Sequence, residues 1–94
     1  MALVLEIIPG EDFYVRDVRF ELVEIHNETA CTVRRDRDGK AFRLSDTHKT
    51  EIAPGTLAFV GTRRQLGLAR IAVEADRLIP VLRGHLYRKT SDPD

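Results

Sequence analysis

Apolar and polar residues alternate with a period of two along most of this chain, which is the pattern of half-buried β-strands. The stretches that carry the pattern, or a short apolar run beside it, are Leu3–Ile8, Phe13–Val15, Val18–Ile25, Thr29–Arg35, Lys40–Leu44, Thr56–Val60, Leu68–Val73 and Leu78–Arg83. Most of them begin 10–12 residues after the one before, within the 8–12-residue spacing of a sandwich or barrel. We therefore predict an all-β fold, a small β-barrel or sandwich.

Turn signals separate these stretches. Pro9-Gly10 and Pro54-Gly55 are turn dipeptides, Arg16-Asp17 links two predicted strands, and Asp38-Gly39 supplies the positive φ angles of a tight hairpin. In Val18–Ile25 the alternation slips at Leu22-Val23, which predicts a β-bulge or a strand buried on both faces.

The last predicted strand contains Pro80, which has no N–H to donate, so its amide position is expected at an edge, a bulge or solvent. Residues 84–89 are expected to form one or two helical turns, and residues 90–94 a frayed tail.

Length and composition limit the class of protein. With 94 residues, 43% hydrophobic and 32% charged, residues 1–94 are expected to form one globular domain. A chain this short makes a marginal monomer, so association through apolar strand surface is expected. No apolar run approaches the roughly 20 residues of a membrane span, and the start lacks the basic region of a signal peptide. Cys31 is the only cysteine, which favours a cytoplasmic location.

Charge is distributed unevenly although the net charge is zero. Residues 1–25 carry six acids against two arginines, whereas residues 56–94 carry seven bases against four acids. A basic C-terminal part is compatible with phosphate contacts.

The sequence contains no pattern typical of a catalytic site or a metal site. His26, His48 and His85 are scattered and lack partners at metal-ligand spacing, so no metal is expected. Cys31 alternates with Val33 as a core residue, and no Cys/His pair or paired carboxylates indicate a nucleophile or an acid–base couple. There is no glycine-rich phosphate loop. We expect a protein without catalytic residues or cofactor, not an enzyme.

Residues at both ends of the chain fit the sequence pattern of one known protein family. The C-terminal stretch, residues 69–88, aligns without a gap with the pattern V-R-I-G-[VI]-x-A-P-x-x-V-x-V-H-R-E-E-I-Y. The residues that match are Arg70, Ile71, Val73, Ala75, Val81, Arg83 and Tyr87, with Leu86 as a conservative match. At the N-terminus, Leu3, Leu5, Gly10 and Glu11 fit the opening L-x-L-T-R-[RK]-x-G-E. In these residues both ends resemble the bacterial carbon storage regulator family. The resemblance makes residues 1–25 and 68–89 the family-like core and residues 26–67 an insertion between the family's third and fourth strands.

The resemblance implies a fold and a function. The family forms interlocked homodimers that exchange strands, and it regulates translation by binding RNA hairpins with a GGA core in messenger leaders or small regulatory RNAs. RNA lies against the first strand of one protomer and the last strand of the other. Carried over, this implies RNA contacts at Leu5, Val81, Leu82 and Arg83, with Arg83 at the position of the family's critical arginine. An arginine there can bind phosphate bidentately or stack on a base.

The first strand departs from the family pattern. Glu6-Ile7-Ile8 stands where the family has Thr-Arg-[Arg/Lys], and Leu82 replaces a histidine. Losing cations from a phosphate-facing strand weakens RNA binding. One hypothesis is that arginines of the inserted segment replace them as accessory contacts, namely Arg34, Arg35, Arg63 and Arg64; the alternative for these residues is a solvated surface. The alternative function is a non-enzymatic module that binds a protein partner on the same scaffold.

Overall fold

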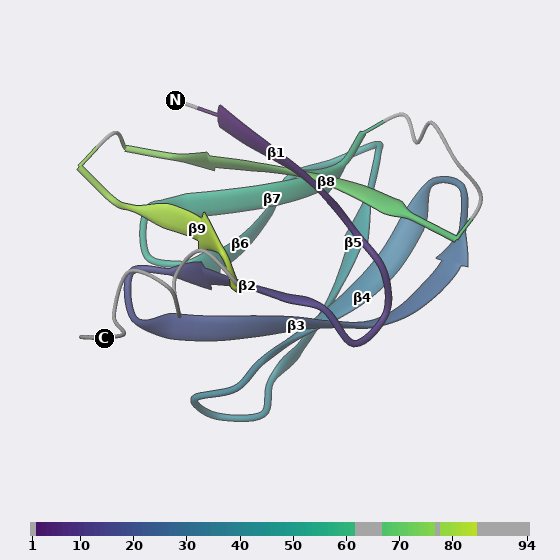
Figure 1. The fold of residues 1–94 in the computed structure, drawn as a ribbon. Helices are drawn as coiled ribbons and strands as arrows, with labels where there is room; N and C mark the ends of the chain where they lie inside the picture. The colour runs from purple at the N-terminus through teal and green to yellow at the C-terminus, as the bar shows by residue number, and fades with distance from the viewer. Residues whose placement is uncertain (1, 62–66, 77, 85–94) are drawn as a thin grey trace.

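The computed structural model describes residues 2–61, 67–76 and 78–84, and these form two antiparallel β-sheets packed face to face (Figure 1). One sheet has the order β1 (Ala2–Ile7), β8 (Ala69–Ala75), β7 (Thr56–Val60) and β6 (Thr50–Ala53). The other has the order β5 (Ala41–Ser45), β4 (Ala30–Arg35), β3 (Val18–Asn27), β2 (Asp12–Val15) and β9 (Val81–Arg83). The predicted all-β class is confirmed. The described residues include no helix that is both long and apolar enough to cross a membrane.

The core lies between the sheets and is built from alternate residues of each strand. Leu5 and Ile71 come from the four-stranded sheet, and Phe20, Leu22 and Leu44 from the five-stranded sheet; all five are completely buried. The rings of Phe13 and Phe20 stack with centroids 5.3 Å apart. Burial of these side chains is the main stabilising term of such a sandwich, at about 25 cal/mol per Å² of apolar surface.

The two end strands find their neighbours within the chain. β1 pairs with β8 in an unbroken register that places Leu5 opposite Ile71. β9 pairs with β2, where Arg83 lies opposite Phe13. Each sheet therefore joins segments from both ends of the sequence, and β1 and β9 are each at an edge of their sheet.

The segment predicted as an insertion is part of both sheets. β4 and β5 extend the five-stranded sheet beyond β3, whereas β6 and β7 extend the four-stranded sheet beyond β8. Core residues from this segment include Val33, Leu44, Ile52 and Ala58. The described strands of this segment, β4 to β7, consequently share one hydrophobic core with the two ends.

Local predictions can be compared with the strands. The predicted bulge is present, because the β3–β4 register shifts between Leu22 and Glu24. Gly39 and Gly55 have φ of 71° and 72°, which glycine adopts without strain, but Asp38 does not have the positive φ expected for both residues of the Asp38-Gly39 turn. The last strand starts at Val81, not Leu78, so Pro80 precedes it, and the Pro80 carbonyl accepts a hydrogen bond from Arg16 N at 2.8 Å. The expected C-terminal helix falls on residues 84–89, of which only Gly84 is described.

Candidate functional site

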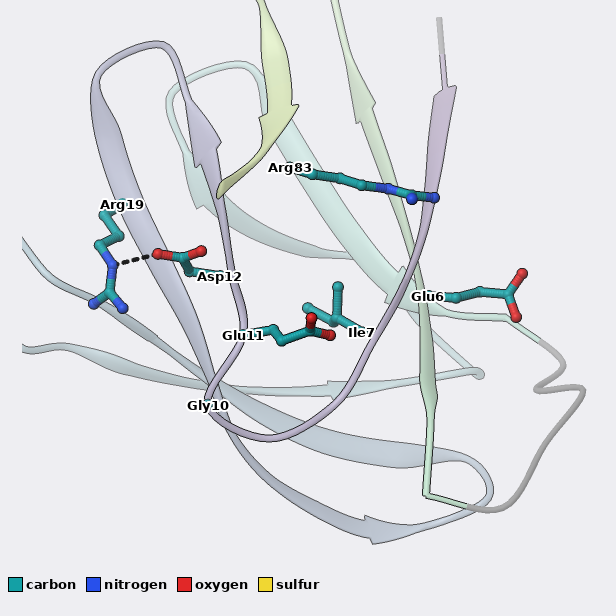
Figure 2. Close-up of a pocket in the computed structure, with 7 residues that line it drawn as sticks. All are labelled: Glu6, Ile7, Gly10, Glu11, Asp12, Arg19 and Arg83. Carbon is teal, nitrogen blue, oxygen red and sulfur yellow. Dashed lines mark hydrogen bonds and ion pairs between the residues drawn. The ribbon is translucent and has the colours of Figure 1, made fainter. Parts of the chain in front are cut away.

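A groove of about 400 Å³ opens between the first and the last strand of the chain (Figure 2). β1 forms one side, and β9 with the start of β2 forms the other. The residues that line it are Glu6, Ile7, Gly10, Glu11, Asp12, Arg19 and Arg83. The groove exists because the edge strands β1 and β9 do not pair with each other, so the sandwich stays open along this side.

Arg83 reaches the groove because of its register in β9. It lies directly opposite Phe13, and opposed residues of an antiparallel pair point to the same face of the sheet. Phe13 points into the core, so Arg83 also points toward the other sheet, and at the open edge its side chain extends toward β1 (Figure 2). The guanidinium is exposed, and it has no ion pair or hydrogen bond with the residues that the structure describes.

Arg19 in the same groove has a different environment, because Asp12 neutralises it. Arg19 Nε donates to Asp12 Oδ2 at 2.6 Å, and Asp12 is only 6% exposed. Glu21 and Asp36 lie 3.7 and 3.8 Å from Arg19 Nη1. The hydrogen bond to Asp12 is the main cause that raises the pKa of the Arg19 guanidinium. Arg19 is therefore fixed in place as a permanent cation within an anionic cluster.

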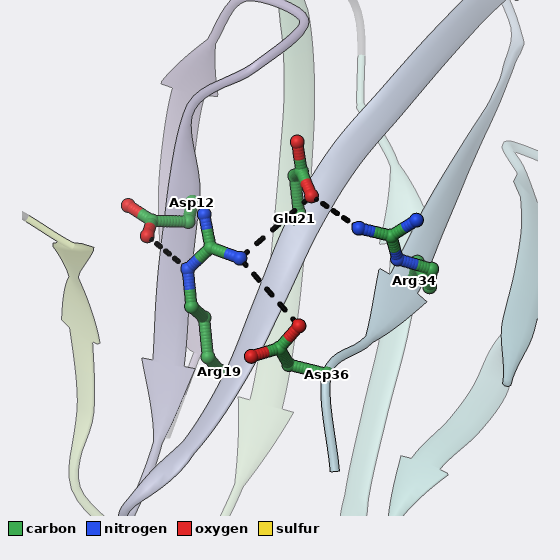
Figure 3. Close-up of polar contacts among 5 residues, drawn as sticks. All are labelled: Asp12, Arg19, Glu21, Arg34 and Asp36. Carbon is green, nitrogen blue, oxygen red and sulfur yellow. Dashed lines mark hydrogen bonds and ion pairs between the residues drawn. The ribbon is translucent and has the colours of Figure 1, made fainter. Parts of the chain in front are cut away.

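This cluster continues across the outer face of the five-stranded sheet (Figure 3). Glu21 also accepts a hydrogen bond from Arg34 Nη2 at 2.8 Å, so β2, β3 and β4 are linked by alternating charges. Exposed pairs of this kind contribute little to stability. The Asp12–Arg19 pair is partly shielded from water, and it shapes one wall of the groove.

The groove as a whole has mixed charge. Its carboxylates are Glu6, Glu11 and Asp12, against the guanidiniums of Arg19 and Arg83. Glu11 is partly engaged, because its Oε1 accepts a hydrogen bond from Ile8 N at 2.9 Å, and Glu6 points away from Arg83 on the far side of β1 (Figure 2). The arrangement offers one unpaired guanidinium at the centre of a cleft whose rim carries acids.

Three of the predicted RNA contacts are apolar and lie on different faces. Leu5 is completely buried, so its side chain has no surface to offer a ligand, and the expected contact there is wrong for the side chain. Val81 lies opposite Val15 and packs against the core. Leu82 lies opposite Tyr14 on the outer face of the sheet. Of this group, only Leu82 points outward.

The accessory arginines do not gather around the groove. Arg34 binds Glu21. Arg35 binds Asp38 at 2.6 Å, donates to the Ile52 carbonyl at 2.8 Å and lies over the Phe42 ring. Their hairpin, β4–β5, is at the edge of the five-stranded sheet opposite to β9, so it does not supply the cations missing from β1. Arg63 and Arg64 lie outside the described residues.

Sequence reasoning missed Asp12 and Arg19 as groove residues. Their alternation with Phe13 and Phe20 indicates that they face away from the core, but only the β2–β3 register brings the two side chains together. The described residues contain no group of three potential metal ligands. Cys31 is buried, and desolvation raises the pKa of its thiol to about 11, which makes it a poor nucleophile.

Comparisons with known proteins do not assign this chain to a family. Neither protein-family models, nor curated proteins, nor solved structures give a match. The function is therefore inferred from the groove and from the residues that line it.

Proposed function

We propose that this protein is a non-catalytic RNA-binding regulator of translation, and that RNA occupies the groove between β1 and β9. The observation that carries the proposal is Arg83, an exposed guanidinium without a partner among the described residues, at the opening between the two edge strands. In the resembling family RNA lies against the first strand of one protomer and the last strand of the other, whereas here the first and last strands of a single chain flank one groove.

The chemistry of a single arginine fits this role. A guanidinium stacks on an unpaired base or binds a phosphate with two hydrogen bonds, and lysine reproduces neither geometry. Arg19 stiffens the neighbouring wall but is already neutralised by Asp12. Arg83 is therefore the residue on which affinity depends.

The experiment that tests the proposal is a fluorescence-anisotropy titration with a GGA-bearing RNA hairpin. Arg83→Ala is expected to weaken binding at least about tenfold, corresponding to about 1.4 kcal/mol, and Arg83→Lys is expected not to restore it. The matched control is Arg43→Ala, which removes an exposed arginine from β5, at the opposite edge of the same sheet. Equal affinity of the wild type and Arg83→Ala, or an equal loss in Arg43→Ala, would contradict the proposal.

Salt dependence separates the two ways in which Arg83 can act. Each phosphate contact to a single strand adds about 0.7 to the slope of log K against log salt. A slope that falls by about that amount in Arg83→Ala identifies a phosphate contact, whereas an unchanged slope with weaker binding identifies stacking on a base.

The acids at the groove favour a second candidate, a module that binds a protein partner. Glu6 and Glu11 line the same groove as the Arg83 guanidinium, and carboxylates repel an RNA backbone but accept lysine or arginine from a polypeptide. A specific protein captured from the native host's lysate with nuclease present, together with no RNA binding by the wild type, would support this candidate over the first.

A further inference from the structure

We propose that β1 is a homotypic interaction edge, along which two copies of this chain pair their first strands in antiparallel orientation and join their four-stranded sheets into one. This interface does not rest on the proposed RNA binding, but it uses the free side of β1 that opens onto the groove, so a second copy and RNA would compete for this edge. It differs from strand exchange, because each copy keeps the pairing of β1 with its own β8.

The free side of β1 follows from the hydrogen-bond pattern of its sheet. Gly61 N donates to the Arg70 carbonyl at 2.7 Å, so Arg70 turns its backbone groups toward β7. Because alternate residues of a strand turn to opposite neighbours, Ile71 and Val73 turn toward β1.

The same rule applied to β1 defines its free groups. Leu5 and Leu3 are the register partners of Ile71 and Val73, so these two residues turn their backbone groups toward β8. Ala2, Val4 and Glu6 therefore point their N–H and C=O groups away from β8, at the outer side of this edge strand.

β1 carries fewer of the devices that keep edges from pairing than the other edge strands do. Edge strands are commonly protected by charged side chains, above all lysine, and by proline, a bulge or short length. The three remaining edges in the described sheets all have one: β5 carries Arg43, the β6 register shifts between Glu51 and Ala53, and β9 has three residues preceded by Pro80. β1 has six residues, an unbroken register and Glu6 as its single charge.

Exposed apolar surface is concentrated at this strand. The large hydrophobic residues that are exposed in the described part of the chain are Leu3, Val4, Ile8, Val23 and Leu78. Three of the five belong to β1 or follow it directly, with exposed fractions of 37%, 38% and 46% for Leu3, Val4 and Ile8. A second strand laid along the edge would cover part of this surface and satisfy the free backbone groups.

The occupant is a second copy because β1 is complementary to itself in one register. The free edge ends at Ile8, whose N–H and carbonyl already bond with the Glu11 side chain and Glu11 N. A twofold axis at Val4 uses every free residue, since Val4 faces Val4 of the second copy and Ala2 faces its Glu6.

The alternative registers form fewer backbone hydrogen bonds or bring like charges together. An axis at Leu5 places Ala2 opposite Ile8, whose backbone groups are occupied. An axis at Glu6 places two carboxylates directly opposite each other, which is destabilising. The register centred on Val4 keeps the two Glu6 side chains apart.

This register gives a sharp test. Val4→Lys and Val4→Glu each place like charges opposite each other at the axis, so each variant alone is expected to be monomeric, with association weakened at least tenfold. An equimolar mixture of the two is expected to recover a heterodimer. The readout is mass by light scattering and sedimentation across a concentration series, with circular dichroism to verify the fold.

Val23→Lys is the matched control, because Val23 is also an exposed valine, 45% exposed, but lies on the interior strand β3. It is expected to associate like the wild type. A second variant, Val4→Pro, removes an N–H that bonds nothing in its own sheet, and it is expected to be a folded monomer. A wild type that stays monomeric at all concentrations, a Val4→Lys variant that still associates, or a mixture that does not recover the dimer would overturn the proposal.

Discussion

Single side chains in this protein acquire their properties from burial, and Cys31 is the simplest case. Cys31 is 1% exposed, and burial away from water raises the pKa of its thiol from 9.0 to about 11. Because a thiolate is unfavourable inside the core, the Cys31 thiol of the folded protein stays protonated at pH values at which the thiol of the unfolded chain ionises.

Alkaline pH is consequently expected to destabilise the fold through Cys31. Between about pH 9 and pH 11 the unfolded chain loses the thiol proton and the folded chain keeps it, so the free energy of unfolding falls as pH rises. The pKa difference corresponds to a loss of the order of 2 kcal/mol. Urea unfolding at a series of pH values should show a shallower decline in Cys31→Val, and parallel curves for the two proteins would refute this account.

Thr56 is the second residue whose burial has a consequence. It is completely buried at the start of β7, and its Oγ1 has no hydrogen-bond partner in the described structure. Burying a hydroxyl without a partner costs about 1–3 kcal/mol.

Thr56→Val is therefore expected to stabilise the protein by about 1 kcal/mol, because valine has nearly the same shape and needs no hydrogen bond. Thermal unfolding should show a raised Tm. Thr50→Val serves as the control, since Thr50 lies on the neighbouring strand β6 but is partly exposed. A lower Tm in Thr56→Val would mean that the hydroxyl has a partner.

Among the elements, β9 is the most dependent on close packing. It has three residues and pairs only with β2. The next residue, Gly84, lies so close to Asp12 that a Cβ there would overlap the carboxylate. Attachment of the strand that carries Arg83 thus depends on a glycine.

A double-mutant cycle measures this dependence. Gly84→Ala is expected to destabilise the protein by about 1–3 kcal/mol through overpacking. In the Asp12→Ala background the carboxylate is absent, so the same substitution should cost less, with a coupling energy of about 1 kcal/mol. Chemical denaturation of the four proteins provides the cycle, and strictly additive costs would show that Gly84 and Asp12 do not interact.

How far the elements follow from the sequence depends on their length. Long alternating stretches such as Val18–Ile25 are strands, and even the bulge after Leu22 was visible as a slip in the pattern. β6 was missed because only Ile52 of its four residues is completely buried. One buried position does not produce the alternation of apolar and polar residues by which a strand is recognised. The hairpin with Arg34 and Arg35 was predicted, but its place at the sheet edge opposite to β9 depends on strand order, which local pattern does not encode.

The candidate site was predictable to a similar degree. Arg83 was singled out through a family resemblance that remains a prediction. The groove itself joins Glu6, Asp12 and Arg83, which come from strands far apart in the sequence. These residues come together only because β1 pairs with β8 and β9 pairs with β2. The sequence alone could therefore predict Arg83 as a site residue but not which residues surround it.

At the scale of the whole molecule, the pairing of Leu5 with Ile71 has a consequence for synthesis on the ribosome. At 5–20 residues per second, several seconds separate the emergence of β1 from that of β8. During this interval the hairpins between β1 and β8 can form from neighbouring residues, whereas β1 has no strand with which to pair. Such long-range closure is slow compared with local pairing. We expect the nascent chain to be most vulnerable to aggregation in that interval, because β1 stays unpaired until β8 has been made.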